Sequence, residues 1–437
     1  MENIDTKIPT LLDLGRDDFE YPKFTQDMVK DYTILIPSML DIHMSLFEGA
    51  LKQCGYKVEV MKNETRAVVD EGLKYVHNDT CYPALLVIGQ FIDNLNHRTD
   101  THKVVCLITQ TGGGCRASNY FHLLRKALLK AGYGYVPVVS LNAHSLEKDS
   151  GFKITLPFIK KAAAAMTYGD HIMYLRNKTR SYEKNKGETQ RTVDAWIKEL
   201  LKQMENGKGT SYSDLKHNIE QISKDFDAIP LNLDHAIPKV GVVGEIYIKY
   251  ASLGNNHLED FLVSQNAEVM VPGLYGFMLY SLYNSIYDHE IYGRSKKAAM
   301  FAKILIKYLR RREKLMIESI KKTKFTPMNY FSRTKDLSEG VLDHGTKMGE
   351  GWLLTAEMME LTEIGYPNII CAQPFGCLPN HICGKGVMKK IRNLNPESNI
   401  IAIDYDPSQT KVNQENRIKL MLAIAKERIK EDEKPKL

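Results

Sequence analysis

The sequence predicts an α/β protein with two parallel-sheet lobes, a helical connector between them and a helical insertion in the second lobe. Short runs of β-branched and apolar residues alternate with helix-like segments near both ends of the chain, as in βαβ units. The chain has 437 residues, 43% of them hydrophobic, and is too long for one ordinary core. We therefore expect two lobes of the flavodoxin or Rossmann type.

The first lobe is expected over residues 1–150. The run Val104–Ile108 is apolar throughout, as in a strand that a parallel sheet buries on both faces. The predicted strands are Tyr32–Pro37, Lys57–Met61, Lys103–Thr109 and Tyr135–Ser140, and the predicted helices are Ile42–Gln53, Arg66–Tyr75 and Asn119–Ala131.

Residues 151–236 are expected to form the connector, which is helical from Leu156 to about Ile229 with a break at Gly207–Gly209. The second lobe follows over residues 237–437, with its helical insertion at about 274–325. Its predicted strands are Lys239–Ile248, Glu268–Val271, Asn368–Ala372 and Asn399–Ile403, and helices are predicted at Leu274 to about Lys322, from Trp352, and at Lys411–Glu431.

Charge and hydropathy limit the expected partners. The net charge of +6 is mild for this length and does not argue for nucleic acid. No run approaches the ~18 to 20 apolar residues of a membrane span, and Met1–Asp18 does not resemble a secretory leader, so we expect a cytoplasmic protein without a membrane partner. The segment from Arg294 to Lys324 contains twelve Lys or Arg residues and only two acidic residues, Glu313 and Glu318. This stretch is either a solvated helix face or a docking surface for an acidic partner or a CoA phosphate.

Seven cysteines in such a chain do not form a disulfide framework, because a reducing compartment keeps them as thiols. Cys54 and Cys106 are interpreted as small buried hydrophobic residues, and Cys371 is ambiguous. Cys81, Cys115 and Cys377 each lie in a turn before a helix-compatible segment, where a helix N-terminus favours the thiolate that binds metal.

Glycines accompany two of these three cysteines. Gly113, Gly114 and Gly376 would let the backbone approach a group wider than a single metal ion, and are candidate cofactor-binding residues. No C-x-x-C pair is present, so spacing alone does not decide between a metal site and structural cysteines. A zinc-stabilised α/β protein also remains possible on this ground.

The cysteine contexts resemble the 2-hydroxyacyl-CoA dehydratase family, and most closely the C-terminal part of large fusion proteins related to the dehydratase activase. The resemblance covers the chain from about Tyr32 to Ala425. Its motifs are Asn78–Ala84 (NDTCYPA), Gln110–Tyr120 (QTGGGCRASNY), Gln373–His381 (QPFGCLPNH) and Asp404–Pro407 (DYDP).

The resemblance implies a [4Fe-4S] cluster between two α/β lobes, held by Cys81, Cys115 and Cys377, with one iron position open. In the family, an ATP-hydrolysing activator with its own iron–sulfur cluster supplies an electron at very negative potential, and a 2-hydroxyacyl-CoA is dehydrated through a ketyl radical. The chain lacks a G-x-x-x-x-G-K-[ST] loop, so we expect ATP use to come from that partner. Dehydratases use two related subunits, which implies a homologous subunit or self-association.

Two further readings of the resemblance remain open. Some relatives hold a double-cubane cluster and reduce small substrates other than CoA thioesters, and Cys371 and Cys383 are near enough to Cys377 to serve such a cluster. A protein that only relays electrons is the non-catalytic alternative. Whether CoA binds, and which substrate is used, does not follow from the sequence.

Other positions beside the cysteines carry side chains or N–H groups that suit a site. Arg116 could offset cluster charge or hold an anionic substrate, or could be an exposed stacking residue. Asn380 and His381 could donate hydrogen bonds to sulfide, and Asn380 could equally cap a helix. Glu245, expected on a strand, is interpreted as a member of a structural ion pair rather than an acid in a crevice. The segment His344–Gly351 is either a plain turn or a set of N–H donors for a phosphate or the cluster.

Overall fold

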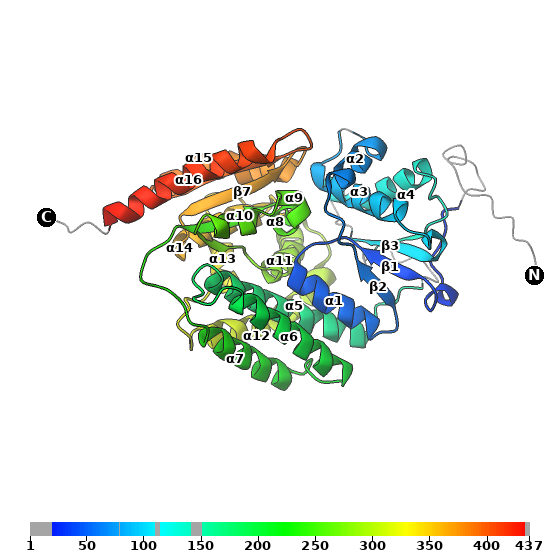
Figure 1. Ribbon diagram of the computed structural model, residues 1–437, viewed down its shortest axis with the longest axis horizontal. Coiled ribbons are helices and arrows are strands. Elements are labelled where there is room, and N and C mark those ends of the chain that lie inside the picture. The colour runs from blue at the N-terminus through cyan, green and yellow to red at the C-terminus, as the bar shows by residue number, and fades with distance from the viewer. Residues whose placement is uncertain (1–19, 78, 110–113, 141–150, 433–437) are drawn as a thin grey trace, which may run out of the picture. The chain divides into compact units, whose positions relative to one another are not determined.

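The chain divides into two units, residues 1–159 and 160–437. The computed structural model describes residues 20–77, 79–109, 114–140 and 151–432 (Figure 1). Each unit contains one four-stranded sheet whose strands are all parallel. The predicted α/β class with two parallel-sheet lobes is therefore confirmed.

The sheet of the first unit has the order β2-β1-β3-β4. Its strands are β1 (Thr33–Ile36), β2 (Lys57–Val60), β3 (Val104–Ile108) and β4 (Val138–Ser140), and its helices are α1 (Asp41–Lys52), α2 (Arg66–Tyr75), α3 (Tyr82–Asn96) and α4 (Tyr120–Lys130). Strand β1 pairs with β2 on one side and β3 on the other, with Thr33 opposite both Lys57 and Val104. All five residues of β3 are buried, as the non-alternating run predicted.

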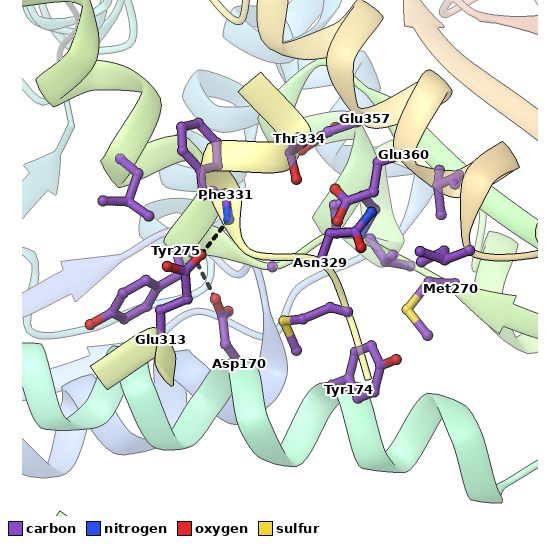
Figure 2. Close-up of a pocket in the computed structure, with 18 of the residues that line it drawn as sticks. Asp170, Tyr174, Met270, Tyr275, Glu313, Asn329, Phe331, Thr334, Glu357 and Glu360 are labelled. Carbon is purple, nitrogen blue, oxygen red and sulfur yellow. Dashed lines mark hydrogen bonds between the residues drawn. The ribbon is translucent and has the colours of Figure 1, made fainter. Parts of the chain in front are cut away.

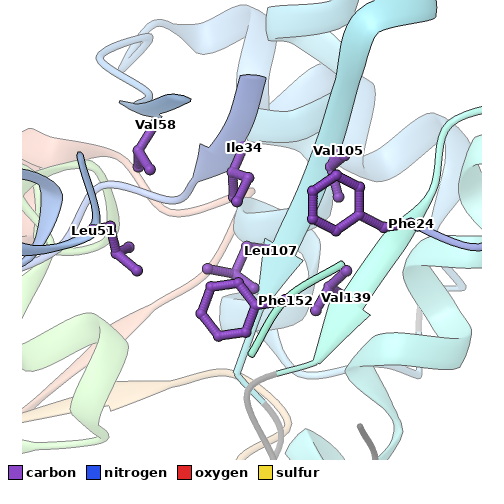
Figure 3. Close-up of a cluster of buried hydrophobic side chains, with 8 residues drawn as sticks. All are labelled: Phe24, Ile34, Leu51, Val58, Val105, Leu107, Val139 and Phe152. Carbon is purple, nitrogen blue, oxygen red and sulfur yellow. The ribbon is translucent and has the colours of Figure 1, made fainter. Parts of the chain in front are cut away.

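Figure 3 shows part of the core of this unit, a cluster of eight buried residues: Phe24, Ile34, Leu51, Val58, Val105, Leu107, Val139 and Phe152. Phe24 precedes the first strand of the sheet in sequence, and Phe152 follows the last one. Gly151 joins them, because its N–H donates to the Phe24 carbonyl at 2.6 Å. A Cβ at Gly151 would lie 2.4 Å from the Thr25 carbonyl oxygen, so only glycine fits there.

The sheet of the second unit has the order β6-β5-β7-β8. Its strands are β5 (Lys239–Gly244), β6 (Glu268–Met270), β7 (Asn368–Pro374) and β8 (Asn399–Tyr405). Its helices are α5 (Leu156–Thr179), which begins just before the boundary of the units, α6 (Glu188–Glu205), α7 (Tyr212–Asp227), α8 (Ile246–Tyr250), α9 (Ser252–Asn255), α10 (Leu258–Ser264), α11 (Leu274–Tyr292), α12 (Lys296–Ile320), α13 (Phe331–Leu337), α14 (Trp352–Glu363), α15 (Met388–Leu394) and α16 (Lys411–Asp432). The segment predicted as a connector is α5, α6 and α7.

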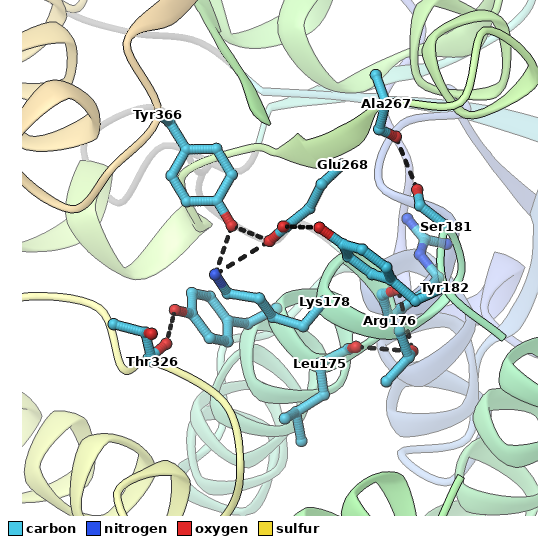
Figure 4. A network of polar contacts seen from close by, with 11 residues as sticks. Leu175, Arg176, Lys178, Ser181, Tyr182, Ala267, Glu268, Thr326 and Tyr366 are labelled. Carbon is cyan, nitrogen blue, oxygen red and sulfur yellow. Dashed lines mark hydrogen bonds and ion pairs between the residues drawn. The ribbon is translucent and has the colours of Figure 1, made fainter. Parts of the chain in front are cut away.

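A buried polar network joins α5 to β6 in this unit (Figure 4). The Lys178 ammonium lies 3.2 Å from the Glu268 carboxylate and also contacts the Tyr366 hydroxyl. Tyr182 donates to the other Glu268 oxygen at 2.7 Å. Burial lowers the pKa of Lys178, and the nearby Glu268 opposes that shift. Removing one partner would leave a buried charge uncompensated, so the network holds α5 in place on the sheet.

Two predicted elements are wrong in part, and one helix was not predicted. The strand predicted at Lys239–Ile248 ends at Gly244, and Ile246–Tyr250 form a helix although their β-branched and aromatic side chains suit a strand. The helix predicted from Leu274 to Lys322 is two helices, because Gly293 ends α11 with a φ of 66°. Helix α3 had no predicted bounds, since its residues are buried nearly all round and show no amphipathic period.

Within the part of the chain that the structure describes, no helix is both long and apolar enough to cross a lipid bilayer.

Candidate metal centre

The two sheets have the same strand order when their strands are numbered along each unit. In each unit the first strand lies between the second and the third. The chain therefore goes from the first strand to a neighbour on one side, and then crosses to the neighbour on the other side. Ligands of open α/β sheets bind at such a point, beyond the carboxyl ends of the strands. Cys115 follows β3 and Cys377 follows β7, and these two strands occupy equivalent positions in their sheets.

In the first unit, Cys81 and the segment after Cys115 meet at one side chain. Cys81 is the N-cap residue of α3 and is 5% exposed. Its sulfur lies 2.9 Å from the hydroxyl of Tyr120, the first residue of α4. Cys115 is partly buried and precedes a short 3-10 helix, Arg116–Asn119, that leads into α4. The structure thus brings Cys81 next to the segment that Cys115 begins.

The glycine loop before Cys115 is only partly covered by the structure. Gly113 lies outside the described residues, as does the rest of 110–113. Gly114 is exposed, and so is Arg116. The predicted roles of these residues beside a cofactor stay predictions.

In the second unit, Cys377 lies in the turn between β7 and a π-helical turn, Asn380–Gly384. Its side chain is 6% exposed, and its carbonyl accepts a hydrogen bond from the His381 N–H at 3.2 Å, so Cys377 begins the helical turn. Gly376 has a φ of 74°, which favours glycine on backbone grounds alone. The Asn380 amide donates to the Cys377 sulfur at 3.5 Å. The hydrogen bond expected from Asn380 to a cluster sulfide stays a prediction.

Two carboxyl groups influence Cys377 from the carboxyl end of β5. Glu245 is the N-cap of α8 and accepts the Ile248 N–H at 2.9 Å, while buried Glu350 accepts the Ile246 N–H at 2.9 Å. The ion pair predicted for Glu245 is thus replaced by a helix cap. Burial raises the pKa of both carboxyls, and the negative charge of Glu350 raises that of Glu245 further.

Burial, and then Glu350 and Glu245, raise the pKa of the Cys377 thiol well above its usual range. These effects outweigh the hydrogen bonds from Asn380 that lower the pKa, so the expectation that a helix N-terminus favours the thiolate is wrong for Cys377. Metal coordination deprotonates a thiol even where burial disfavours the anion, so the shift does not exclude Cys377 as a ligand.

The remaining cysteines fall into two groups. Cys106 is buried in β3, where burial raises the pKa of its thiol, while Cys54 is only partly buried and lies beyond the end of α1. Cys371 and Cys383 are buried close to the Cys377 turn. The Cys371 sulfur lies 3.9 Å from the same Asn380 side chain that contacts Cys377. A Cβ at Gly384 would lie 2.9 Å from the Cys371 sulfur.

Two other candidates are accounted for by contacts within the second unit. The His381 Nε2 atom lies 3.0 Å from the Gln373 amide rather than next to a cysteine. The segment His344–Gly351 forms a closed turn, because the Trp352 N–H donates to the Thr346 carbonyl at 2.8 Å.

The side chains around Cys81 and Cys377 are compatible with iron–sulfur ligands. Cys81 and Cys377 each lie beside a group able to donate to sulfur, the Tyr120 hydroxyl and the Asn380 amide. Thiolate ligands of clusters are commonly supported by such outer contacts. Among the described residues, no three His, Cys, Asp or Glu side chains group into a site ready for a metal ion. Neither a scan against protein-family models nor a search of curated proteins finds a match for this chain.

Sequence reasoning did not identify Tyr120 or Glu350 as neighbours of the cysteines. Tyr120 is the last residue of the motif Gln110–Tyr120, so the motif could have indicated that Tyr120 lies near a cysteine. Glu350 is 27 residues before Cys377, and no local pattern connects it to that turn.

Proposed function

We propose that this chain is the iron–sulfur redox component of a two-protein system resembling the 2-hydroxyacyl-CoA dehydratases. Cys81, Cys115 and Cys377 would hold a [4Fe-4S] cluster, and the cluster would supply Lewis-acid and one-electron chemistry when bound. The substrate is an acyl-CoA thioester that is dehydrated or reduced, and the protein acts in an anaerobic cytoplasm.

The observation that carries this proposal is the equivalent placement of Cys115 and Cys377. Both follow the third strand of a sheet with the same order, at the end where ligands of α/β sheets bind. Cysteines kept only for packing have no reason to recur at this position in both units. The sulfur of Cys81 lies beside the hydroxyl of Tyr120, which belongs to the segment that follows Cys115.

Residues of this chain have defined tasks in the proposal. Tyr120 and Asn380 would donate hydrogen bonds to the sulfurs of Cys81 and Cys377, and so orient them. Glu245 and Glu350 would exclude water from the Cys377 side and hold protons there, since burial favours their neutral forms.

The first test is anaerobic purification followed by iron and sulfide analysis and electron paramagnetic resonance. We expect about four irons per chain in the native protein and their loss in Cys115→Ala. Cys54→Ala is the matched control, because Cys54 is partly exposed and belongs to none of the motifs, and it should keep its iron. If the native protein contains no iron, or if Cys115→Ala keeps the same iron content, the proposal is wrong. Zinc in place of iron would support a structural metal site.

A double-cubane reductase acting on a small non-CoA substrate is the second candidate. It is favoured by one observation, that Asn380 contacts the sulfurs of both Cys371 and Cys377. In this case roughly eight irons per chain are expected, and Cys371→Ser should remove about half of them. A cluster that accepts electrons but turns over no substrate would identify a non-catalytic relay.

The ATP-dependent activator is proposed to dock on α12. Its exposed side includes Met300, Phe301 and Ile304, each 60% exposed or more, beside Lys303, Lys307 and Arg311. An apolar strip with a basic border suits an acidic protein surface. Arg312 does not belong to this side, because it is buried and its guanidinium stacks on Tyr308.

Reversing the charge of Lys303, Lys307 and Arg311 together should slow activator-dependent reduction at least about tenfold at low salt, because basic residues steer an acidic partner. Stopped-flow absorbance of the cluster measures the rate. The matched control reverses three exposed lysines away from α12, Lys198, Lys202 and Lys208. An equal rate in both triple variants would leave α12 as an ordinary solvated helix.

A further inference from the structure

A cavity in the second unit has no part in the proposed iron site. It lies among α5, α11, α12 and α14 and the segment before α13, and has a volume of about 80 Å³ (Figure 2). By the space that one water needs, this is room for roughly half a dozen water-sized groups. The partly exposed Met328 and Asn329 line it, so a small ligand has an entry at this segment.

The middle of the cavity is apolar and polarisable. Met270, Met316 and Met328 contribute thioethers, and Tyr174 and Phe331 contribute aromatic rings. Such side chains suit methylene groups and, through the ring faces, organic cations. They do not suit Mg²⁺ or Ca²⁺, which require shells of oxygen ligands.

Carboxylates lie at two separate sides of this apolar middle. Figure 2 shows Asp170 and Glu313 on one side, and Glu357 and Glu360 on the other. Among the described residues that line the cavity, none is Lys, Arg or His.

Two of the four carboxylates already have strong partners. Asp170 caps α11 by accepting the N–H groups of Leu274 and Tyr275 at 2.9 and 2.7 Å. Gly273 makes this possible, because a Cβ there would lie 2.4 Å from an Asp170 oxygen. Glu357 forms a buried ion pair with Lys249 at 3.0 Å.

Glu313 and Glu360, one on each side, form no ion pair in the described part of the chain, although the charge of Arg310 acts on Glu313. Glu313 is 5% exposed, with one oxygen accepting the Phe331 N–H at 2.6 Å, while its Oε2 is buried without a hydrogen-bond partner. Glu360 has contacts with Thr334 and with the Asn329 backbone. Burial raises the pKa of both carboxyls, to about 8 for Glu360. An unpaired buried carboxylate is costly, and a bound cation would remove that cost.

We propose that this cavity binds a short aliphatic diamine as its diammonium ion. One ammonium group pairs with Glu313, the other pairs with Glu360, and the methylene chain lies against the thioether and aromatic side chains between them. A four-carbon diamine has six non-hydrogen atoms, which matches the space. The structure supports this assignment through the orphan Glu313 oxygen, the apolar middle and the carboxylates on both sides.

The test is isothermal titration calorimetry of the full-length protein with putrescine, n-butylamine and butanediol. We expect putrescine to bind at least about tenfold more tightly than n-butylamine, because only the diamine pairs with both carboxylates, and butanediol not to bind. Equal affinity for the two amines, preference for Mg²⁺ or Ca²⁺, or no binding of putrescine would each overturn the proposal. These ligand comparisons use the native chain, so they do not depend on a variant that folds.

Variants then locate the site. Glu313→Gln and Glu360→Gln should each weaken putrescine binding about tenfold and bring its affinity close to that of n-butylamine. Glu318→Gln is the matched control, since Glu318 is on the same helix as Glu313 but bonds outward to Lys321 and Tyr330. Thermal unfolding checks that each variant is folded. Unchanged affinity in both folded cavity variants would place the diamine elsewhere, and either result leaves the iron analysis unaffected.

Discussion

At the scale of single residues, His171 shows how burial in this protein suppresses ionisation. It lies in α5 with none of its surface exposed, and its Nε2 atom lies 2.8 Å from the Ser223 hydroxyl of α7. Ser319 of α12 donates to the same hydroxyl at 2.8 Å. Burial lowers the pKa of His171 to about 4, so the folded protein keeps this imidazole neutral at a pH where the unfolded chain protonates it.

This shift predicts a loss of stability in mild acid. Above pH ~6.5 neither state binds a proton at His171, and as the pH falls toward 4 only the unfolded state does, so the free energy of unfolding decreases. Between pH 7.5 and 5 the decrease from this one residue should be about 2 kcal/mol. Urea unfolding at both pH values measures it.

The comparison uses His171→Gln, in which this part of the decrease should disappear whatever the variant's stability at pH 7.5. His97→Gln is the control, since the His97 side chain is 76% exposed. If His171→Gln shows the full decrease of the native protein, His171 is not the residue responsible.

At the scale of elements, the crossing of α2 and α3 depends on two glycines that sequence patterns did not single out. A Cβ at Gly89 would lie 2.0 Å from the Val68 carbonyl oxygen and 2.8 Å from the Gly72 nitrogen. A Cβ at Gly72 would lie 2.4 Å from the Leu85 carbonyl oxygen. The helices approach each other closely enough for backbone to contact backbone, and Cys81 is positioned by the start of the second one.

Gly89→Ala should therefore reduce the free energy of unfolding by about 3 kcal/mol, because backbone atoms cannot move aside as a flexible side chain would. Calorimetry measures the loss. Gly276→Ala is the control, since the nearest atom to its Cβ is 3.8 Å away and alanine favours a helix by up to about 1 kcal/mol. If Gly89→Ala leaves the free energy of unfolding unchanged, α2 and α3 can move apart without a loss of stability.

Helices and strands were predicted correctly where their sequence pattern is visible in a short window. The strand β3 and the helices α1, α2 and α4 were predicted within a residue or two, because a buried run and an amphipathic period are visible in a short window. Ile246–Ile248 was mistaken for the end of a strand, because the helical turn there depends on Glu350, which is distant in sequence and accepts the Ile246 N–H. Tertiary contacts of that kind override local propensity.

At the scale of the whole molecule, the sequence predicted two parallel-sheet lobes but not that their strand orders would be the same. Pairing of strands is set by contacts between distant segments, such as Val240 with Asn368, and no local pattern encodes them. The same limit applies to the candidate site. The motifs identified Cys81, Cys115 and Cys377 as candidates, whereas Tyr120 beside Cys81 and the carboxyls near Cys377 required the fold.

If the proposed cluster takes ligands from both units, it would also couple their stabilities. Each unit has its own sheet and core, so we expect the iron-free protein to unfold in two calorimetric transitions. In the proposed site, a group bound by Cys81 and Cys115 of one unit and Cys377 of the other would be released when either unit unfolds, so its binding free energy would stabilise both. Iron loading should raise both transitions by several degrees and bring them together.

Cys377→Ala separates this coupling from a local effect. The substitution is in the second unit, yet in iron-treated protein it should lower the transition of the first unit toward its iron-free value, while Cys54→Ala should leave both transitions high. If iron loading raises only one transition, or if Cys377→Ala affects the second unit alone, the metal is held within one unit. The three cysteines would then not form a single site, even if the iron content is as expected.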